Sequence, residues 1–329
     1  MAPSPPPLQP LEFERPLMAI EDKIAELLSS SEQMGVDFSD EVERLRHQAQ
    51  EVKMRLYSNL TPVNRLQIAR HPQRPNFLEL ARRLSPDVWI EMRGDRAGKD
   101  DRACLGGIIE LSGRPVMLLG AQKGRGMKES LAHNFGMSNP EGYRKALRLF
   151  QHAEKFNMPV VTLIDTPGAY PGMEGEQRGI GQAIAFNIRE MARLRTPIVS
   201  IVTGEASSGG ALGMGVANRI YMLEHALYTV ISPEGCASIL WRSADYAAQA
   251  ATALKICAHD LQGFGIVDGV IPEPLGGAHH NPDAMAERLA TTIQAALEEL
   301  GAMTPEQLIE DRYRKYRAIG AFESAGGAL

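Results

Sequence analysis

The sequence Pro159-Val-Val-Thr-Leu-Ile-Asp165 decides the fold, together with the turn that follows it, Thr166-Pro-Gly-Ala-Tyr-Pro-Gly172. The same arrangement recurs in Pro197-Ile-Val-Ser-Ile-Val-Thr203, which is followed by Gly204-Glu-Ala-Ser-Ser-Gly-Gly-Ala-Leu-Gly213. Apolar runs of this length, rich in Val and Ile and bounded by Pro and Gly, predict strands that are buried on both faces. Each turn leads into a helical pattern, which is typical of a parallel sheet.

The doublet Gly209-Gly210 lies where the helix after the second strand should begin. Neither residue has a Cβ, so a ligand atom can approach the main-chain amides closely. The first N–H groups of a helix have no partner within the helix, and the helix dipole favours negative charge beside them. We therefore interpret the doublet as a site for an anion or a developing oxyanion. Close packing of this helix against a strand is the alternative interpretation.

The composition is ordinary for a soluble globular protein. Of 329 residues, 44% are hydrophobic and 23% are charged. The formal net charge of -5 argues against nucleic acid as the main partner. Cys104, Cys236 and Cys257 are odd in number and widely spaced, which indicates reduced thiols rather than disulfides or a zinc site. Because no apolar leader or bilayer-spanning run is found, we expect a cytoplasmic protein without membrane contact.

The sequence pattern divides the chain into four regions. Residues 1–15 are rich in proline, and we expect them to be disordered. Residues 16–85 are an N-terminal helical region that begins with an antiparallel helical hairpin, in which Asp40 is the expected N-cap of the second helix. Residues 86–300 form the main domain, and residues 301–329 form a C-terminal helix and tail.

Strand and helix patterns alternate through the main domain. Besides the two central runs, strand patterns occupy residues 104–111, 115–119, 219–223, 226–231 and 266–271, and helical patterns occupy residues 139–156, 176–194, 244–257 and 282–300. This alternation predicts the α/β class with a largely parallel central sheet.

Two nucleotide-binding motifs are incomplete in this sequence. The spacing from Gly204 to Gly209 matches a phosphate-binding loop, but Gly210 stands where the loop requires a lysine. No Gly-x-Gly-x-x-Gly motif opens a first strand–helix unit, so a dinucleotide site is disfavoured. Ser208 is placed like the nucleophile of a strand–helix elbow, but a serine nucleophile requires a base within reach. His225 precedes a strand pattern, and we interpret it as a surface or packing residue.

Several charged residues near the central turns have two interpretations. Asp165, at a strand end, is a possible catalytic acid, but we favour hydrogen bonds to the amides of its own turn. Lys123, Arg125 and Lys128 can meet phosphates or a carboxylate, although a solvated loop is the simpler use. Glu234 fits an acidic residue in the first turn of a helix.

Motifs throughout the chain resemble those of one family, the alpha subunits of bacterial and plastid acetyl-CoA carboxylase carboxyltransferases. The resemblance covers nearly the whole chain except its start and its last residues. It rests on these segments in fixed order: Ala69-Arg-His-Pro-Gln-Arg-Pro75, Gly94-Asp-Arg-Ala97, Gly113-Arg-Pro-Val-Met117, Gln122-Lys-Gly-Arg125, Asn134-Phe-Gly-Met137, Pro140-Glu-Gly-Tyr-Arg-Lys-Ala-Leu-Arg148, Ile164-Asp-Thr-Pro-Gly-Ala-Tyr-Pro-Gly172, Ser208-Gly-Gly-Ala-Leu212, Ile231-Ser-Pro-Glu-Gly-Cys-Ala-Ser-Ile-Leu-Trp241 and Ile271-Pro-Glu-Pro-Leu-Gly-Gly-Ala-His279.

The resemblance implies a fold, an activity and partners. The fold is a ClpP/crotonase-like spiral of ββα units with an N-terminal α-helical extension, and residues 86–300 become its carboxyltransferase domain. The activity is transfer of a carboxyl group from carboxybiotin on a carrier protein to acetyl-CoA, which gives malonyl-CoA in the first committed step of fatty acid synthesis. The implied partners are a beta subunit with a zinc ribbon, in an alpha2beta2 heterotetramer, the biotin carboxyl carrier protein, and biotin carboxylase in the larger ATP-dependent complex.

The resemblance also implies roles for individual residues. Gly209 and Gly210 hold the biotin oxyanion and are the catalytic pair, and cofactor contact is assigned to Gly168, Ala169, Gly209, Gly210 and Ala211, with no metal in this chain. Biotin itself can accept the substrate proton, so a protein base is not required. Ser207 stands where we expect a glycine in many relatives. The alternative function is a Clp-type serine peptidase with Ser208 as its nucleophile.

Overall fold

The computed structural model describes residues 8–320, and its core is one eight-stranded sheet. The strands follow the order β1-β2-β3-β4-β5-β6-β8, and β7 pairs with the end of β5. Their bounds are β1 Trp89–Glu91, β2 Cys104–Leu111, β3 Arg114–Ala121, β4 Val160–Thr166, β5 Ile198–Ser207, β6 Arg219–Leu223, β7 Leu227–Thr229 and β8 Gly269–Ile271. The predicted α/β class is confirmed.

The sheet is antiparallel at one side and parallel across its centre. β1, β2 and β3 are antiparallel, whereas β3, β4, β5, β6 and β8 run parallel. Cys104 pairs with Ala121, so β2 begins at the edge where β3 and β4 end. Every residue of β4 and β5 is buried, as the two apolar runs predict. Loops that follow β4 and β5 and the loop that precedes β2 therefore meet at one edge of the sheet.

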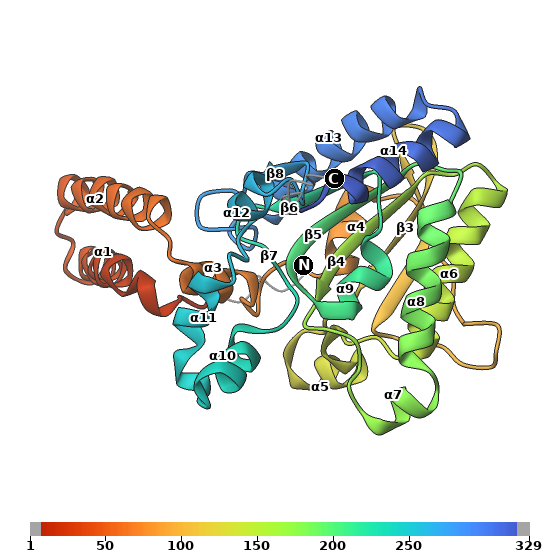
Figure 1. Ribbon diagram of the computed structural model, residues 1–329. Helices are drawn as coiled ribbons and strands as arrows, with labels where there is room; N and C mark the ends of the chain where they lie inside the picture. The colour runs from red at the N-terminus through yellow and green to blue at the C-terminus, as the bar shows by residue number, and fades with distance from the viewer. Residues whose placement is uncertain (1–7, 321–329) are drawn as a thin grey trace, which may run out of the picture.

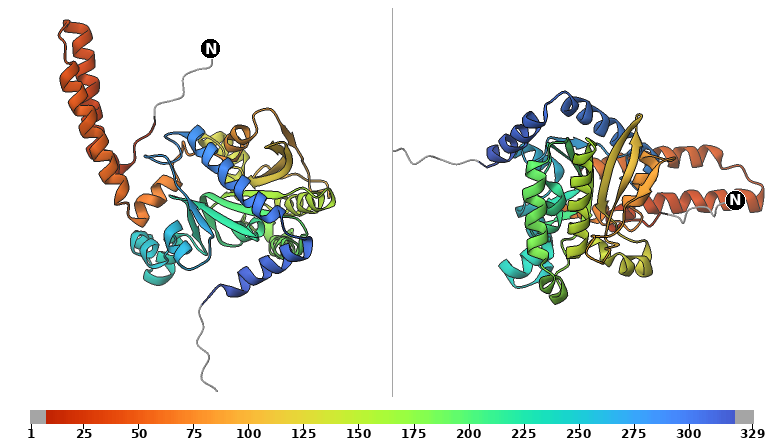
Figure 2. Two further views of the ribbon diagram at one scale, coloured as in Figure 1. Left: turned by 90° about the horizontal axis from the view of Figure 1, so that it is seen from above. Right: turned by 90° about the vertical axis from the view of Figure 1, so that its right-hand side faces the viewer.

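Helices cover both faces of the sheet (Figures 1 and 2). One face carries α6 (Pro140–Lys155), α8 (Ile180–Arg193) and α9 (Ser208–Gly215), and the other carries α4 (Phe77–Leu84) and α13 (Pro282–Gly301). α14 (Pro305–Ala318) ends the described chain and packs beside α8. The longest expected helix in this layer, residues 176–194, is interrupted, because Gly179 has a left-handed φ of 77° between α7 (Met173–Gln177) and α8.

The N-terminal hairpin stands away from this body (Figure 2). It consists of α1 (Arg15–Met34) and α2 (Ser39–Ser58), whose mutual contacts bury Leu17, Val42 and Leu45. Asp40 does not cap α2. The helix begins at Ser39, so Asp40 lies in its first turn, and the Asp37 carboxylate accepts from the Ser39 amide. The antiparallel hairpin is as predicted, but its cap is not.

The expected disordered segment 1–15 is described only from residue 8. Residues Glu12–Glu14 form the short helix η1, and α1 begins at Arg15. The Gln9 amide donates to Gln73 Oε1, and the Gln9 carbonyl lies 2.7 Å from His71 Nε2. The part of the segment that the structure describes is therefore bonded to the body, and residues 1–7 lie outside the described residues.

Short helices connect the main elements and build the rim of the sheet edge. They are α3 Pro62–Ala69, α5 Gly126–Ala132, η2 Asn134–Gly136, α10 Pro233–Trp241, η3 Ala244–Tyr246, α11 Ala247–Ala253 and α12 Ala258–Gly263. Among residues 8–320, no helix is both long and apolar enough to cross a membrane.

Candidate active site at the start of α9

The turn from β5 into α9 exposes main-chain donors. β5 ends at Ser207, and α9 begins at Ser208, whose φ of 57° is left-handed and rare for a residue with a side chain. Within residues 8–320, the amides of Gly209 and Gly210 have no acceptor outside α9, and first-turn amides have none inside a helix. Gly209 is partly exposed, so its N–H group can be reached from solvent, whereas Gly210 is buried.

The two glycines are required for different reasons. A Cβ on Gly210 would lie 2.4 Å from the Ala169 nitrogen and from the Gly168 carbonyl carbon, so the bare backbone is needed for packing. A Cβ on Gly209 would meet only the Ile184 side chain, at 3.5 Å, which is an ordinary contact. Packing therefore explains Gly210 and leaves Gly209 unexplained within this chain.

An apolar cavity of about 510 Å³ opens beside Gly209. Most of its wall comes from segments later in the chain than α9, between Tyr228 and Ile266. The residues that line it are Ser208, Gly209, Leu212, Tyr228, Thr229, Val230, Leu254, Lys255, Ile256, Leu261, Phe264 and Ile266. A largely apolar pocket with a few convergent polar groups is the usual form of a small-molecule site.

The cavity wall has no carboxylate and no imidazole, so it offers no ordinary general base. Its two titratable groups are Tyr228 and Lys255. Burial raises the pKa of Tyr228 to about 12, so this phenol is neutral at physiological pH. Behind α9, burial also raises the pKa of Tyr143, whose hydroxyl donates to the Gly210 carbonyl at 3.3 Å. The arrangement can stabilise charge through fixed dipoles, not through proton transfer by a carboxylate or histidine.

The predicted cofactor contacts are brought together in part. Gly168 and Ala169, in the turn after β4, lie directly against Gly210. Ala211 is fully buried, with its methyl group in the main core. Ser207 buries its hydroxyl without a hydrogen-bond partner among residues 8–320. Of the five predicted cofactor contacts, four therefore lie together: Gly168, Ala169, Gly209 and Gly210. The side chain of the fifth, Ala211, faces the protein interior.

Asp165 is a structural anchor. Its Oδ1 accepts from Lys123 Nζ at 2.6 Å and from the Glu205 amide at 2.9 Å. The prediction that Asp165 bonds the amides of its own turn is wrong, because the adjacent strand β5 offers an amide in better reach. The carboxylate joins the ends of β3, β4 and β5 and helps to hold the site edge together.

The other charged candidates are engaged in ion pairs. Arg125 contacts Glu79, and Arg70 bridges Glu205 and Glu234. Lys123 is engaged with Asp165, whereas Lys128 is exposed on α5. The expected first-turn position of Glu234 in α10 is confirmed. Lys123 and Arg125 are therefore not free cations.

The serine peptidase alternative finds no support at Ser208. His225 is buried, and its Nδ1 lies 2.8 Å from Arg65 Nη1, which confirms a packing role. No histidine among residues 8–320 forms a hydrogen bond with the Ser208 hydroxyl, whereas a serine nucleophile requires such a base. The chain turns sharply at Ser208, and the main-chain amides that follow this turn, rather than a serine nucleophile, are the notable groups there.

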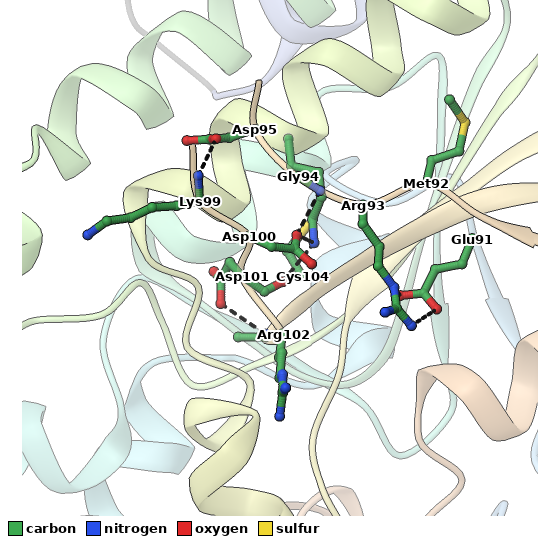
Figure 3. A network of polar contacts seen from close by, with 12 residues as sticks. Glu91, Met92, Arg93, Gly94, Asp95, Lys99, Asp100, Asp101, Arg102 and Cys104 are labelled. Atoms are coloured by element: carbon green, nitrogen blue, oxygen red, sulfur yellow. Dashed lines mark hydrogen bonds and ion pairs between the residues drawn. The ribbon is translucent and has the colours of Figure 1, made fainter. Parts of the chain in front are cut away.

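The loop before β2 carries cations that the sequence analysis missed. Its acids turn inward: Asp95 accepts from the Ala97 and Lys99 amides, Asp101 accepts from the Ala103 and Asn139 amides, and Asp100 pairs with Lys145. Burial raises the pKa of Asp101. The Lys99 and Arg102 side chains point away from these acids (Figure 3) and form no ion pair within residues 8–320. The alternating charge pattern of residues 95–102 was the available signal.

Among the described residues, no group of three His, Cys, Asp or Glu side chains could hold an ion.

Most of the chain matches one family in sequence. A family model described as acetyl co-enzyme A carboxylase carboxyltransferase-like matches residues 10–320. The chain is 50% identical over 315 residues to the acetyl-coenzyme A carboxylase carboxyl transferase subunit alpha of Acaryochloris marina, covering 96% of this chain and 97% of that protein. The protein of the same name from Synechococcus elongatus is 51% identical over 312 residues, covering 95% of each.

Solved structures share the fold at low sequence identity. A Pseudomonas malonate decarboxylase hetero-tetramer in complex with coenzyme A has a TM-score of 0.58 at 20% identity, covering 73% of this chain and 95% of that chain. Transcarboxylase 12S has a TM-score of 0.55 at 21% identity, covering 68% of this chain and 40% of that chain. The predicted ClpP/crotonase-like fold is confirmed by this likeness.

Proposed function

Because the chain belongs to the family of acetyl-CoA carboxylase carboxyltransferase alpha subunits, we propose that it transfers the carboxyl group of carboxybiotin to acetyl-CoA at Gly209 and Gly210. The reaction class, carboxyl transfer to an acyl-CoA, follows from the family. The donor, the acceptor and the residues that carry the reaction are our proposal, as are a cytoplasmic location and a place in fatty acid synthesis.

The observation that carries this proposal is the difference between the two glycines. Gly209 has room for a Cβ and still lacks one, and it borders the 510 Å³ apolar cavity. The cavity fits the apolar part of the biotin ring system, and the free amides fit its ureido oxygen. When bound, carboxybiotin supplies the carboxyl group, and negative charge on the ureido oxygen is what the site must stabilise.

The chain contributes fixed donors beside an apolar wall. The amides of Gly209 and Gly210 point from the positive end of α9, so they favour an anion before it forms. One such donor typically contributes about 2.7–4 kcal/mol to lowering a barrier. The apolar wall strengthens this interaction, because charge–dipole energies grow as the local dielectric falls. Gly168 and Ala169 support the second donor by packing against Gly210.

We propose that a beta subunit with a zinc ribbon completes the site in an alpha2beta2 assembly. Val230, which borders the cavity, is 76% exposed, and Ile239 and Leu240 of α10 are 72% and 63% exposed. Trp241 and Tyr246 extend this apolar surface. Contiguous exposed apolar side chains mark an interaction surface. Covering it would exclude water from the cavity that adjoins Gly209. The biotin carboxyl carrier protein and biotin carboxylase complete the proposed set of partners.

We assign the anionic part of acetyl-CoA to the loop before β2. Lys99 and Arg102 are exposed cations without ion-pair partners among residues 8–320, and they lie at the sheet edge that also carries Gly209. Lys123 and Arg125, which the sequence offered for this role, are already paired. Cations without ion-pair partners can bind phosphate or carboxylate groups.

The substitution Gly209→Ala tests the proposed site. Its Cβ fits the fold at 3.5 Å from Ile184 and adds a methyl group next to the amides that we assign to the oxyanion. We expect kcat to fall at least about 100-fold, with an unchanged melting temperature, in malonyl-CoA formation with the beta subunit and a carboxylated carrier protein.

Gly181→Ala in α8 is the matched control. A Cβ at Gly181 has open space around it, and the residue lies in a helix away from the cavity. We expect full activity from this variant. Wild-type activity in Gly209→Ala would refute the assignment of the oxyanion donors.

A further inference from the structure

α9 cannot fix its own position. The helix has eight residues, Ser208–Gly215, and four of them are glycine. Glycine is the poorest helix former after proline, and isolated helices of this length are not stable in water. The positions of the Gly209 and Gly210 amides must therefore be set by what holds the helix.

Buried side chains from three other elements hold the carbonyl end of α9. Asn187 Nδ2 of α8 donates to the Gly213 carbonyl at 2.9 Å, and Thr162 Oγ1 of β4 donates to the Met214 carbonyl at 2.9 Å. Ser200 Oγ of β5 lies 2.7 Å from Thr162 Oγ1. Asn187, Thr162 and Ser200 are completely buried. These bonds satisfy carbonyl groups that a helix end leaves unpaired.

The last carbonyl of α9 is held from the far end of the chain. Tyr316 of α14 donates from its hydroxyl to the Gly215 carbonyl at 3.1 Å and accepts from the Ala217 amide at 2.9 Å. The Gly215 carbonyl and the Ala217 amide are thus bonded to the same side chain, that of Tyr316, which lies about 100 residues later in the sequence.

α14 is itself locked to the body, so Tyr316 is a fixed point. Arg312, one helical turn before Tyr316, is 1% exposed. Its guanidinium donates to the carbonyls of Met191 and Leu194 at the end of α8 and to Asn218 Oδ1. α14 therefore connects the end of α8, the chain after α9 and the end of α9 itself.

We propose that Tyr316 is a positioning residue for carboxyl transfer, which acts by fixing α9 so that its amide end keeps the geometry of an oxyanion site. This inference rests on the proposed function, because it assigns Tyr316 a role through Gly209 and Gly210. A rigid helix transmits a displacement of one end to the other. A misplacement of about 1 Å at reacting groups lowers the rate by about 100-fold.

The test is Tyr316→Phe, which removes the hydroxyl and keeps the ring. Tyr313→Phe is the matched control, because Tyr313 lies on the same helix and is 60% exposed. Thr162→Val removes a second α9 contact from a different element. Each variant is assayed with the beta subunit and a carboxylated carrier protein, and hydrogen exchange of the peptide 208–217 is measured in the free chain.

We expect Tyr316→Phe and Thr162→Val to accelerate exchange in α9 and to lower kcat about 10-fold or more at an unchanged KM for acetyl-CoA. Tyr313→Phe should match the wild type in both measurements. Unchanged exchange and unchanged kcat in Tyr316→Phe would overturn the inference. Faster exchange in α9 with unchanged kcat would instead refute the proposed function, because α9 would then not carry the reaction.

Discussion

Arg74 and Glu273 form an ion pair that is almost completely removed from solvent. Their side chains are 3% and 0% exposed, and both guanidinium nitrogens meet the carboxylate, at 2.8 and 2.6 Å. Burial alone would raise the pKa of Glu273, but the Arg74 charge outweighs it and lowers this pKa to about 2. Glu273 also accepts from the His225 and Ala278 amides. The pair joins the 71–75 connector to the loop after β8.

Glu273→Gln should strongly destabilise the fold. The neutral amide leaves the Arg74 guanidinium buried without a counter-charge, which typically costs about 3–5 kcal/mol. The free energy of unfolding by urea measures this loss. Glu299→Gln is the control, because Glu299 is half exposed in its pair with Arg219, and we expect its unfolding curve to match the wild type. Equal stability of Glu273→Gln and wild type would contradict this account.

At the residue scale, some residues of the site could be predicted from the local sequence and others could not. Gly209-Gly210 could be predicted because a glycine doublet after a buried strand is a local pattern. Tyr228, Lys255 and Phe264 could not, because they reach the cavity only through the folding of later segments. Asp165 was assigned to its own turn because sequence does not show that the Glu205 amide of β5 lies beside it.

At the scale of elements, three histidines lie near the point where the α1–α2 hairpin meets the rest of the chain. His71 stacks on His279 with ring centroids 3.9 Å apart, and His280 Nδ1 lies 3.2 Å from Lys53 Nζ of α2. Burial lowers the pKa of His279 to about 2 and that of His280 to about 4, and it also lowers the pKa of His71. Arg74 and Lys53 add to the effect, whereas Glu14 and Glu273 oppose it. The lowered pKa values of His279 and His280 disfavour their protonation in the folded protein.

The stability of the protein should therefore fall as the pH falls below about 6.5. The unfolded chain binds protons at these histidines near their ordinary pKa, whereas the folded chain does not, so acid favours unfolding. The free energy of unfolding should decrease by about 1.4 kcal/mol per pH unit for each such histidine. Denaturant unfolding between pH 7 and 5 measures the slope.

His279→Phe keeps a ring to stack on His71 and removes one group that binds a proton on unfolding. The slope of the unfolding free energy against pH should therefore decrease by the contribution of one histidine. His47→Gln is the control, because the His47 side chain is 81% exposed. The same slope in His279→Phe and wild type would show that His279 is not neutral in the folded state.

Sequence periodicity predicted most of these elements. The hairpin helices, β2, β4, β5 and α6 follow from short-range spacing, because their apolar patterns are continuous. The break between α7 and α8 was missed, because Gly179 lies within an otherwise helical pattern. The role of α14 was also invisible, since Arg312 and Tyr316 look like surface residues of an amphipathic helix until α8 and α9 are placed beside them.

At the scale of the whole molecule, one edge of the sheet gathers the parts of the proposed site. The parallel strands β4 and β5 end there, β2 begins there, and the cavity opens there beside Gly209. The hairpin and α14 lie outside this edge (Figure 1). The free chain therefore presents donors and an apolar wall on an open side, as expected of one half of a shared site.

The most direct test is a crystal structure of this chain with its beta subunit and biotin. We predict that the ureido oxygen lies about 2.7–3.1 Å from the amide nitrogens of Gly209 and Gly210, with the partner covering Val230, Ile239 and Leu240. Biotin bound elsewhere, with both amides facing only protein, would contradict the account.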